Sequence, residues 1–396
     1  MKTNLFITAI LVCSIQLCFA QTYKVGHRQL LWVDSSRGNR QVLTELYYPA
    51  DNNGETVPVA SGTMKFATVV FGHGYQLTYT NYLWLKDSLV RKGYFVAFPR
   101  TEEELFPNHS AFAQDLAFIT KKMSTGNTNA TFFFFNRLNN KFAVSGHSMG
   151  GGCALLSVQY SSLISGVCPL AAAETDPSAI TACSGITKPV LIFGGKKDCV
   201  TPPSSNQIPM YNALSSACKV YVEIKNAKHC HWAANGALCT LGEFTCGGFS
   251  TNPSGTYRNT MSLLSPWLGA LLYNRSSDVT TFQNILQTNN DITYQAACVL
   301  GPIALSGNDL PRVEKLQTMP SVVKAGMQVR MALPIVISFQ QLRIYVSNNI
   351  GIRIWQQQLS AHSKLLTIPT SDLPAGTYFV QINADGKLYE GRFLVE

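Results

Sequence analysis

Short apolar runs alternate with amphipathic segments along the first three quarters of the chain. Residues 66–71 form a continuous apolar run, which predicts a strand buried on both faces of a parallel sheet. Apolar residues recur with helical spacing over 81–92, 110–123 and 260–273. Strands are also predicted at 29–33, 42–48, 94–98, 142–145, 166–171, 190–193 and 220–224, with an antiparallel hairpin expected for the first two. This alternation predicts a doubly wound, mostly parallel α/β sheet covered on both faces.

The pattern changes beyond Cys298. Residues 281–297 are predicted as one more helix of the α/β part, and five short runs follow, separated by turn residues, at 342–346, 352–356, 364–368, 377–382 and 387–395. Such runs are typical of a small all-β sandwich. A chain of 396 residues also favours two domains over one. We therefore predict an α/β domain over 21–300, a linker over 301–315 and a β-sandwich domain over 316–396.

The first 20 residues have the features of a secretory signal peptide. Lys2 precedes an apolar run, and the small residue Ala20 precedes the expected cleavage site. The run is too short for a membrane anchor. A lipoprotein would need Cys18 as its first mature residue, which Leu17 fits poorly. We therefore expect a soluble, exported protein. The net charge is +9, but the sequence has no dense run of Lys and Arg, so we expect no nucleic-acid partner.

The cysteine content predicts disulfides. Eleven cysteines are present, and two leave with the signal peptide, so nine remain in the exported protein. An odd number leaves at least one thiol free or paired between chains, and Cys153 is the favoured buried thiol. Spacing does not determine the pairs, but Cys239–Cys246 and Cys168–Cys183 would each close a short loop. No cysteine pair has zinc-site spacing, so we expect no metal.

A Gly-x-Ser-x-Gly pattern lies at the end of a predicted strand, in Gly146-His147-Ser148-Met149-Gly150. The apolar run before it and the glycine-rich start of a helix after it give the strand-turn-helix context of a nucleophile elbow. Glycines at both ends of the turn lack the Cβ atoms that would clash there. Ser148 is therefore the predicted nucleophile, and His147 is expected to pack or hydrogen-bond locally.

A serine nucleophile needs a base, and the base needs a carboxylate that orients it. In this architecture the chain order is serine, acid, histidine. Asp198 follows the strand at 190–193, and His229 follows the strand at 220–224, so both lie in loops at the edge that carries Ser148. The rival residues are Glu174 and Asp176 for the acid and His231 for the base.

Two backbone amides should stabilise the oxyanion that forms when the serine attacks. One is predicted to be that of Met149, directly after the nucleophile. The other should come from the glycine turn after the strand at 66–71, and Tyr75 is the expected donor.

With these residues in place, the segment 29–273 resembles the α/β-hydrolase superfamily, and within it the bacterial cutinase-like polyester hydrolases and their dienelactone-hydrolase relatives. The likeness covers the elbow and the longer run from Asp198 and Pro202 through Lys219 to His229. It implies a secreted serine ester hydrolase, acting as a monomer on small or polymeric esters, with no cofactor. Tyr75 and Met149 would line the acyl site.

The sequence departs from this family at one substrate-binding position. Ala173 falls where the polyester hydrolases carry a tryptophan that clamps the substrate, and Trp232 is the candidate for a replacement wall. We therefore expect soluble short-chain or small aromatic esters to be better substrates than solid aromatic polyester. Cys199 and Cys230 lie roughly where one branch of the family joins two loops by a disulfide, although their offsets differ.

The β-sandwich domain over 316–396 resembles the C-terminal sorting domain of the type IX secretion pathway, most clearly at 371–382 and in the last strand. The resemblance implies export across an outer membrane by the secretion machinery, followed by removal of the domain or attachment at the cell surface. A generic β-sandwich binding module is the alternative for this part. For the whole protein, the alternatives to an esterase are a serine peptidase of the prolyl-oligopeptidase kind and a surface-displayed binding protein with an inactive hydrolase fold.

Overall fold

The computed structural model describes residues 22–234, 236–244, 253–298, 314–315, 318–319, 321–332, 341–348, 353–360, 365–384 and 387–396. The predicted signal peptide, most of the predicted linker and Cys246 lie outside these residues. Among the helices in these ranges, none combines the length and the apolar character needed to cross a membrane.

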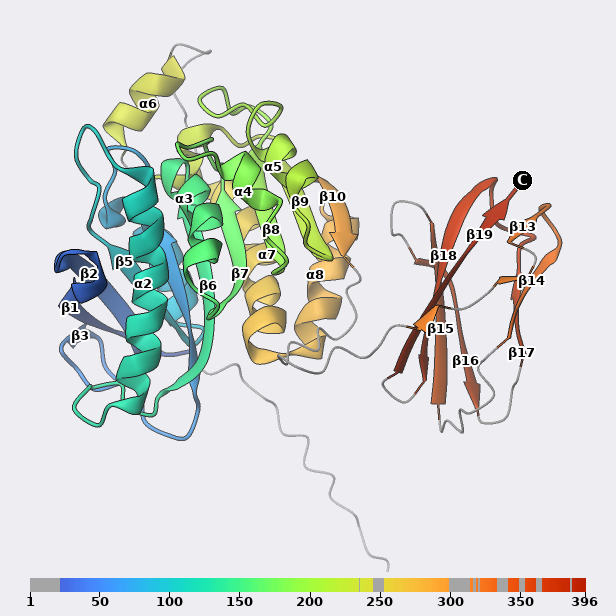
Figure 1. The fold of residues 1–396 in the computed structure, drawn as a ribbon, viewed down its shortest axis with the longest axis horizontal. Helices are drawn as coiled ribbons and strands as arrows, with labels where there is room; N and C mark the ends of the chain where they lie inside the picture. The colour runs from blue at the N-terminus through green and yellow to red at the C-terminus, as the bar shows by residue number, and fades with distance from the viewer. Residues whose placement is uncertain are drawn as a thin grey trace, which may run out of the picture.

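A ten-stranded sheet forms the first part of the protein, with strand order β10-β9-β8-β7-β6-β4-β5-β2-β1-β3 (Figure 1). The six central strands, β4 to β9, are parallel, and β1 and β2 form the expected antiparallel hairpin. The strands are β1 Lys24–Asp34, β2 Arg40–Ala50, β3 Gly54–Glu55, β4 Phe66–Gly72, β5 Tyr94–Pro99, β6 Leu138–His147, β7 Ile164–Leu170, β8 Val190–Gly195, β9 Cys218–Ile224 and β10 Ile292–Cys298.

Helices cover both faces of this sheet, which gives two separate apolar cores. One core joins the sheet to α2, α3, α4 and α5, and the other joins it to α1, α7 and α8. Every residue of β4 is buried, as its continuous apolar run predicts. The helices are α1 Leu83–Val90, α2 His109–Thr128, α3 Met149–Ser157, α4 Ala179–Cys183, α5 Gln207–Ala213, α6 Ala237–Phe244, α7 Ser254–Tyr273 and α8 Ser276–Thr288. The predicted doubly wound α/β class is confirmed.

The predicted helix over 281–297 is wrong in its second half. Helix α8 ends at Thr288, and Ile292–Cys298 forms β10, which pairs antiparallel with β9. Asn289 accepts a hydrogen bond from the Asp291 amide through its side chain, a local turn that competes with continuation of the helix. The strand alternates between more and less buried residues, because only one of its faces packs on the protein.

Two disulfides join described cysteines, Cys218–Cys298 and Cys230–Cys239. Cys199 is also disulfide-bonded. Because Cys230 and Cys239 pair with each other, both the suggested Cys239–Cys246 bond and the suggested link between Cys199 and Cys230 are wrong. Helix α6 folds back onto the loop that follows β9 and brings Cys230 and Cys239 together. The prediction considered only which pairs would close a short loop, and this criterion does not show where α6 lies.

The suggested Cys168–Cys183 bond is also wrong, because both residues are buried free thiols. Cys168 packs in the core on the α7 face of the sheet, whereas Cys183 packs in the core on the opposite face. Cys153 is the third buried thiol, as predicted. Burial raises the pKa of all three thiols, which keeps them protonated and unreactive.

Thiol counting should reflect this arrangement. In denaturant, reduction should raise the number of titratable thiols in the exported protein by at least four, because two disulfides are broken. Under native conditions the buried thiols of Cys153, Cys168 and Cys183 should react slowly with an aromatic disulfide reagent. Nine thiols in denatured, unreduced protein would contradict the disulfide assignment.

The C-terminal part is all β. One sheet has the order β11-β19-β18-β15-β16 with β13 beside β19, and a second sheet has the order β12-β14-β17. Side chains from both sheets share one apolar core, so the predicted sandwich is confirmed. Glu314–Lys315, which falls in the predicted linker, pairs with β19 instead. The strands are β11 Glu314–Lys315, β12 Thr318–Met319, β13 Val322–Val323, β14 Gln328–Ala332, β15 Gln341–Asn348, β16 Arg353–Ser360, β17 Leu365–Pro369, β18 Gly376–Ala384 and β19 Lys387–Val395.

Candidate active site

Ser148 occupies a sharp turn between β6 and α3. Its backbone has φ 54° and ψ −120°, a left-handed conformation that is unfavourable for a residue with a side chain. Close packing of the flanking glycines maintains the turn. A Cβ atom on Gly146 would lie 2.3 Å from the Gly150 carbonyl oxygen, and one on Gly150 would lie 2.3 Å from the Gly72 carbonyl oxygen. The elbow therefore packs directly against the end of β4, and larger residues do not fit there.

The structure brings Ser148, His229 and Asp198 into one chain of hydrogen bonds. His229 Nε2 lies 2.9 Å from Ser148 Oγ, and His229 Nδ1 lies 2.8 Å from Asp198 Oδ2. Because a carboxylate accepts hydrogen bonds, the proton of the neutral imidazole is assigned to Nδ1, which leaves the Nε2 lone pair free for the serine hydroxyl. All three residues are buried. This arrangement can remove a proton from the serine hydroxyl and stabilise the resulting imidazolium.

Thr201 supports the carboxylate, a contribution that the sequence analysis missed. Its amide donates to Asp198 Oδ1 at 2.8 Å, and its hydroxyl donates to Asp198 Oδ2 at 2.9 Å. The Val200 amide adds a third bond at 3.0 Å. These three donors fix the orientation of the carboxylate toward His229. A threonine three residues after an aspartate in a glycine-rich turn is the sequence signal that could have suggested this contact.

The rival residues lie outside this chain of hydrogen bonds. His231 Nδ1 accepts a hydrogen bond from the Lys228 amide and lies 3.0 Å from the Thr256 hydroxyl oxygen. Burial, with smaller contributions from neighbouring lysines, lowers the pKa of His231 to about 4. Glu174 accepts a hydrogen bond from the Ile180 amide at the start of α4, and Asp176 is exposed.

The two predicted oxyanion donors lie in adjacent turns. Tyr75 follows β4, and Met149 is the first residue of α3, which follows β6, the neighbouring parallel strand. Within the described part of the chain, no carbonyl or side chain accepts a hydrogen bond from either amide. Both amides are therefore free to bind an oxyanion. The Tyr75 side chain is partly exposed, and its hydroxyl donates to the Leu105 carbonyl at 2.9 Å.

Of the residues predicted to bind substrate, Ala173 lies next to the nucleophile but Trp232 does not. Ala173 lies beside the nucleophile, since its amide donates to the Ser148 carbonyl at 2.9 Å. Trp232 is fully buried in the core on the α7 face, and its indole N–H donates to the Thr260 hydroxyl. The prediction that Trp232 forms a wall for the substrate is therefore wrong. The short helix His229–Trp232 places the indole in this core.

Helix α6 is attached to the loop that carries His229, a feature that sequence reasoning also missed. Besides the Cys230–Cys239 disulfide, the buried Glu243 side chain accepts a hydrogen bond from the Cys230 amide at 2.5 Å. Burial raises the pKa of Glu243, and the hydrogen bond from the Cys230 amide and the charge of Lys228 oppose this effect. The helix therefore restrains the backbone directly after His229.

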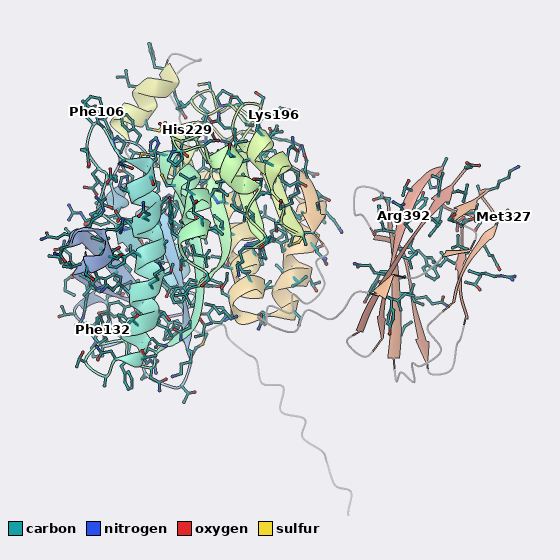
Figure 2. The ribbon with its side chains drawn as sticks, viewed as in Figure 1. Phe106, Phe132, Lys196, His229, Met327 and Arg392 are labelled. Atoms are coloured by element: carbon teal, nitrogen blue, oxygen red, sulfur yellow. A yellow bond between two sulfur atoms is a disulfide. The ribbon has the colours of Figure 1, made fainter. Side chains whose placement is uncertain are left out.

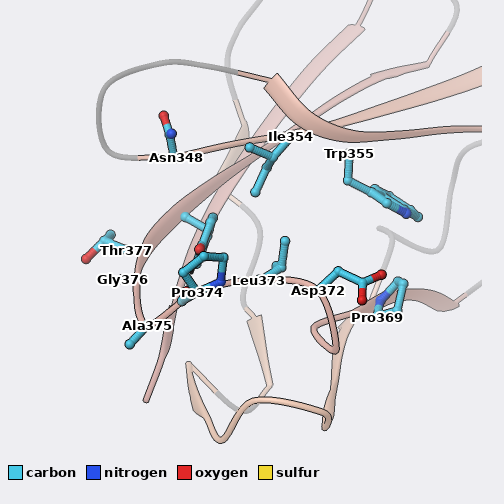
Figure 3. Close-up of a pocket in the computed structure, with 11 residues that line it drawn as sticks. Asn348, Ile354, Trp355, Pro369, Asp372, Leu373, Pro374, Ala375, Gly376 and Thr377 are labelled. Atoms are coloured by element: carbon cyan, nitrogen blue, oxygen red, sulfur yellow. Dashed lines mark hydrogen bonds between the residues drawn. The ribbon is translucent and has the colours of Figure 1, made fainter.

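A pocket of about 560 Å³ lies in the β-rich part and is unconnected with the hydrogen-bonded chain (Figure 3). It is formed by β16, β18 and the turn between β17 and β18, with Trp355, Asp372 and Leu373 among its lining residues. None of the predicted catalytic residues lines it. In the ranges that the structure describes, no cluster of His, Cys, Asp and Glu could hold a metal ion.

Two protein families match the chain, one in each of its parts. Residues 328–396 match the secretion system C-terminal sorting domain, which indicates a secreted or cell-surface protein. Residues 33–248, which include Ser148, Asp198 and His229, match a family described as PET hydrolase-like.

Similar curated proteins include a cutinase, est1, from Thermobifida alba, which is 29% identical over 202 residues. A bis(hydroxyethyl) terephthalate hydrolase from Streptomyces coelicolor is 26% identical over 202 residues. Each alignment covers 50% of this chain, and they cover 61% and 58% of these relatives, respectively. The chain thus spans about three fifths of the length of these relatives. Since the family match covers more than half of the chain, the chain belongs to the PET hydrolase-like family.

Proposed function

We propose that this protein is a secreted serine hydrolase of carboxylic esters that acts through an acyl-enzyme. The proposal rests on the hydrogen-bonded chain of Ser148, His229 and Asp198, which follows the carboxyl ends of three parallel strands. Family membership supports the same chemistry. The reaction assigned to these residues requires no cofactor.

In the proposed reaction, Ser148 Oγ attacks the ester carbonyl carbon while its proton passes to His229 Nε2. The carbonyl oxygen becomes an oxyanion, which accepts hydrogen bonds from the Tyr75 and Met149 amides. The carbonyl re-forms as the alcohol leaves with the proton from His229. Water then attacks the acyl-serine with His229 again acting as base, and the acid product leaves as Ser148 recovers its proton. Asp198 holds the imidazole in the required tautomer throughout.

Exposed apolar side chains occur in segments at the same edge of the sheet as this site, which supports a hydrophobic substrate. Phe106 is 86% exposed and Leu241 is 62% exposed, which is unusual for large apolar residues. Figure 2 shows Phe106 and His229 at the same end of the α/β part. The apolar rim consists of Tyr75, Leu105, Phe106, Val200, Leu241 and Phe244, which lie in the segments after β4, β5 and β8 and in α6.

The Phe106 segment is held firmly at its base. Glu102 accepts a hydrogen bond from the Asn108 amide and forms an ion pair with Arg40 at 2.6 Å. Arg40 also pairs with the fully buried Asp115 at 2.7 Å. Leu105 and Phe106 are therefore presented on a well-anchored loop, and we propose that the apolar rim contacts the apolar portion of an ester or an ester surface. Aliphatic polyesters and terephthalate esters are candidate polymeric substrates.

The experiment that tests the function combines a fluorophosphonate probe with a set of substrates. The probe should label Ser148, and short-chain soluble esters should be cleaved faster than the corresponding amides. If the probe does not react and no ester is cleaved, the protein has a binding role instead. Faster cleavage of peptide amides than of esters would favour the peptidase alternative.

Ala173→Trp tests the shape of the acyl site. An aromatic wall beside the nucleophile contributes about 0.5–1.5 kcal/mol through ring contacts, so the specificity constant for an aromatic ester should rise roughly two- to tenfold. The parent should cleave a soluble short-chain ester well and aromatic polyester film only weakly. The measurement compares product release from the soluble ester and the film for both proteins. Efficient film degradation by the parent, with no gain in the variant, would show that another element supplies the wall.

A further inference from the structure

Two fully buried side chains connect the turn after β4 with the loop that carries His229. The Gly74 amide donates to the Tyr82 hydroxyl oxygen at 2.9 Å, and this oxygen lies 3.0 Å from His147 Nδ1. On the other side of the imidazole, His147 Nε2 lies 3.1 Å from the His229 carbonyl oxygen. Tyr82 ends the short helix Tyr79–Tyr82, and His147 is the last residue of β6.

Only one assignment of the protons satisfies all three hydrogen bonds of this network. The Gly74 amide can only donate, so the Tyr82 oxygen accepts from it, and the Tyr82 hydroxyl proton is free for His147 Nδ1. The His229 carbonyl can only accept, which assigns the remaining imidazole proton to His147 Nε2. This arrangement needs a neutral His147. Burial and the neighbouring His229 lower the pKa of His147 well below its usual range, in agreement with that state.

These groups are closely packed. A Cβ atom on Gly74 would lie 3.1 Å from both His147 Nδ1 and the Tyr82 oxygen, so the glycine allows the backbone to approach the side chains. The rings of His147 and His229 lie 4.7 Å apart between their centroids. Tyr82 and His147 thus fill the space between the two loops as well as joining them.

We propose that Tyr82 and His147 are positioning residues that hold the oxyanion turn and the base at a fixed separation around Ser148. The inference rests on the proposed ester hydrolysis. Gly74 directly precedes Tyr75, the proposed oxyanion donor, and His147 directly precedes the nucleophile. One continuous network therefore reaches the backbone of all three loops, and loss of its central hydroxyl shifts the amide and the imidazole relative to the reacting carbon.

Tyr82→Phe removes only the central hydroxyl and leaves both neighbours without a partner. Since small misplacement of reacting groups can lower rates about a hundredfold, we expect kcat for a soluble ester to fall roughly 10- to 100-fold while KM changes less than about twofold. The matched control is Tyr48→Phe. Tyr48 is also fully buried, and its hydroxyl donates to the Val57 carbonyl at 2.6 Å, a bond that is not part of the Tyr82–His147 network. This control should keep kcat within about twofold of the parent.

A boronic acid provides a readout that a purely structural role would not change. It forms a tetrahedral adduct with the serine and places a negative oxygen at the oxyanion position, so its inhibition constant should rise about tenfold in Tyr82→Phe and remain unchanged in Tyr48→Phe. Equal kcat and equal boronate affinity in the two variants would overturn the proposal. A parent enzyme without esterase activity would instead overturn the proposed function.

A second pair of variants covers the case in which Tyr82→Phe does not fold. His147→Gln keeps one acceptor for Tyr82 and one donor for the His229 carbonyl, whereas His147→Met has a similar length and offers neither. We expect the glutamine variant to retain at least about tenfold more kcat than the methionine variant, at similar KM. Equal kcat values in the two variants would show that His147 only fills space.

Discussion

Ser148→Ala is expected to lower ester turnover by about four to six orders of magnitude, because a nucleophile and its base act as one unit. The residual rate should come from substrate binding and the oxyanion donors alone. The fold should persist, since the substitution removes a hydroxyl whose bond in the structure is to His229 and leaves the glycine packing of the elbow untouched. The measurements are steady-state ester hydrolysis and thermal unfolding.

Ser145→Ala is the matched control for this prediction. Ser145 lies on β6, shortly before the elbow, is also buried, and its hydroxyl donates to the Cys168 carbonyl rather than to a reacting group. It should lose some stability, about 1 kcal/mol for a buried hydrogen bond, and keep most of its turnover. Ser148→Ala protein with turnover within tenfold of the parent would disprove the assignment of the nucleophile.

His229→Ala should be nearly as damaging as loss of the nucleophile, because no other base lies within hydrogen-bonding distance of Ser148 Oγ in the described chain. His231→Ala should retain most of the turnover. His231 has hydrogen-bond partners in Lys228 and Thr256, and its pKa of about 4 leaves it neutral near pH 7.

The comparison of these two variants is made with kcat/KM on one soluble ester at neutral pH. Both histidines lie in the same short helix, so the two substitutions should disturb the local structure similarly. A difference in activity between the variants then reports the role of each imidazole. If His231→Ala proved inactive and His229→Ala remained active, the base would be His231, and the orientation of this loop during catalysis would differ from the one described.

The parts of the fold that the sequence predicts well are those with strong local patterns. Continuous apolar runs such as Val190–Gly195 and Phe66–Gly72 identify strands buried on both faces, and parallel strands bring the segments after them to one edge. That is why Ser148, Asp198 and His229 could be placed near one another from their positions alone, although their catalytic roles remain predictions.

The parts that the sequence analysis missed depend on long-range packing. The strand character of β10 arises from pairing with β9, whereas its local composition also suits a helix. Trp232 is apolar and adjacent to the base, yet only the direction of a short helix determines that it points into the core. The contact of Tyr82 with His147 joins residues 65 positions apart, which no spacing rule anticipates.

The Cys218–Cys298 disulfide has a mechanical consequence. Cys298 ends β10 and pairs with Cys218, the first residue of β9, whereas His229 follows the opposite end of β9. A pulling force on the C-terminal domain, during export or while the protein is held at a cell surface, enters the sheet at this cross-link. The disulfide transmits this force to the first residue of β9, so β10 does not separate from β9 under load. The loop that carries His229 follows the other end of β9 and therefore lies outside the path of the force.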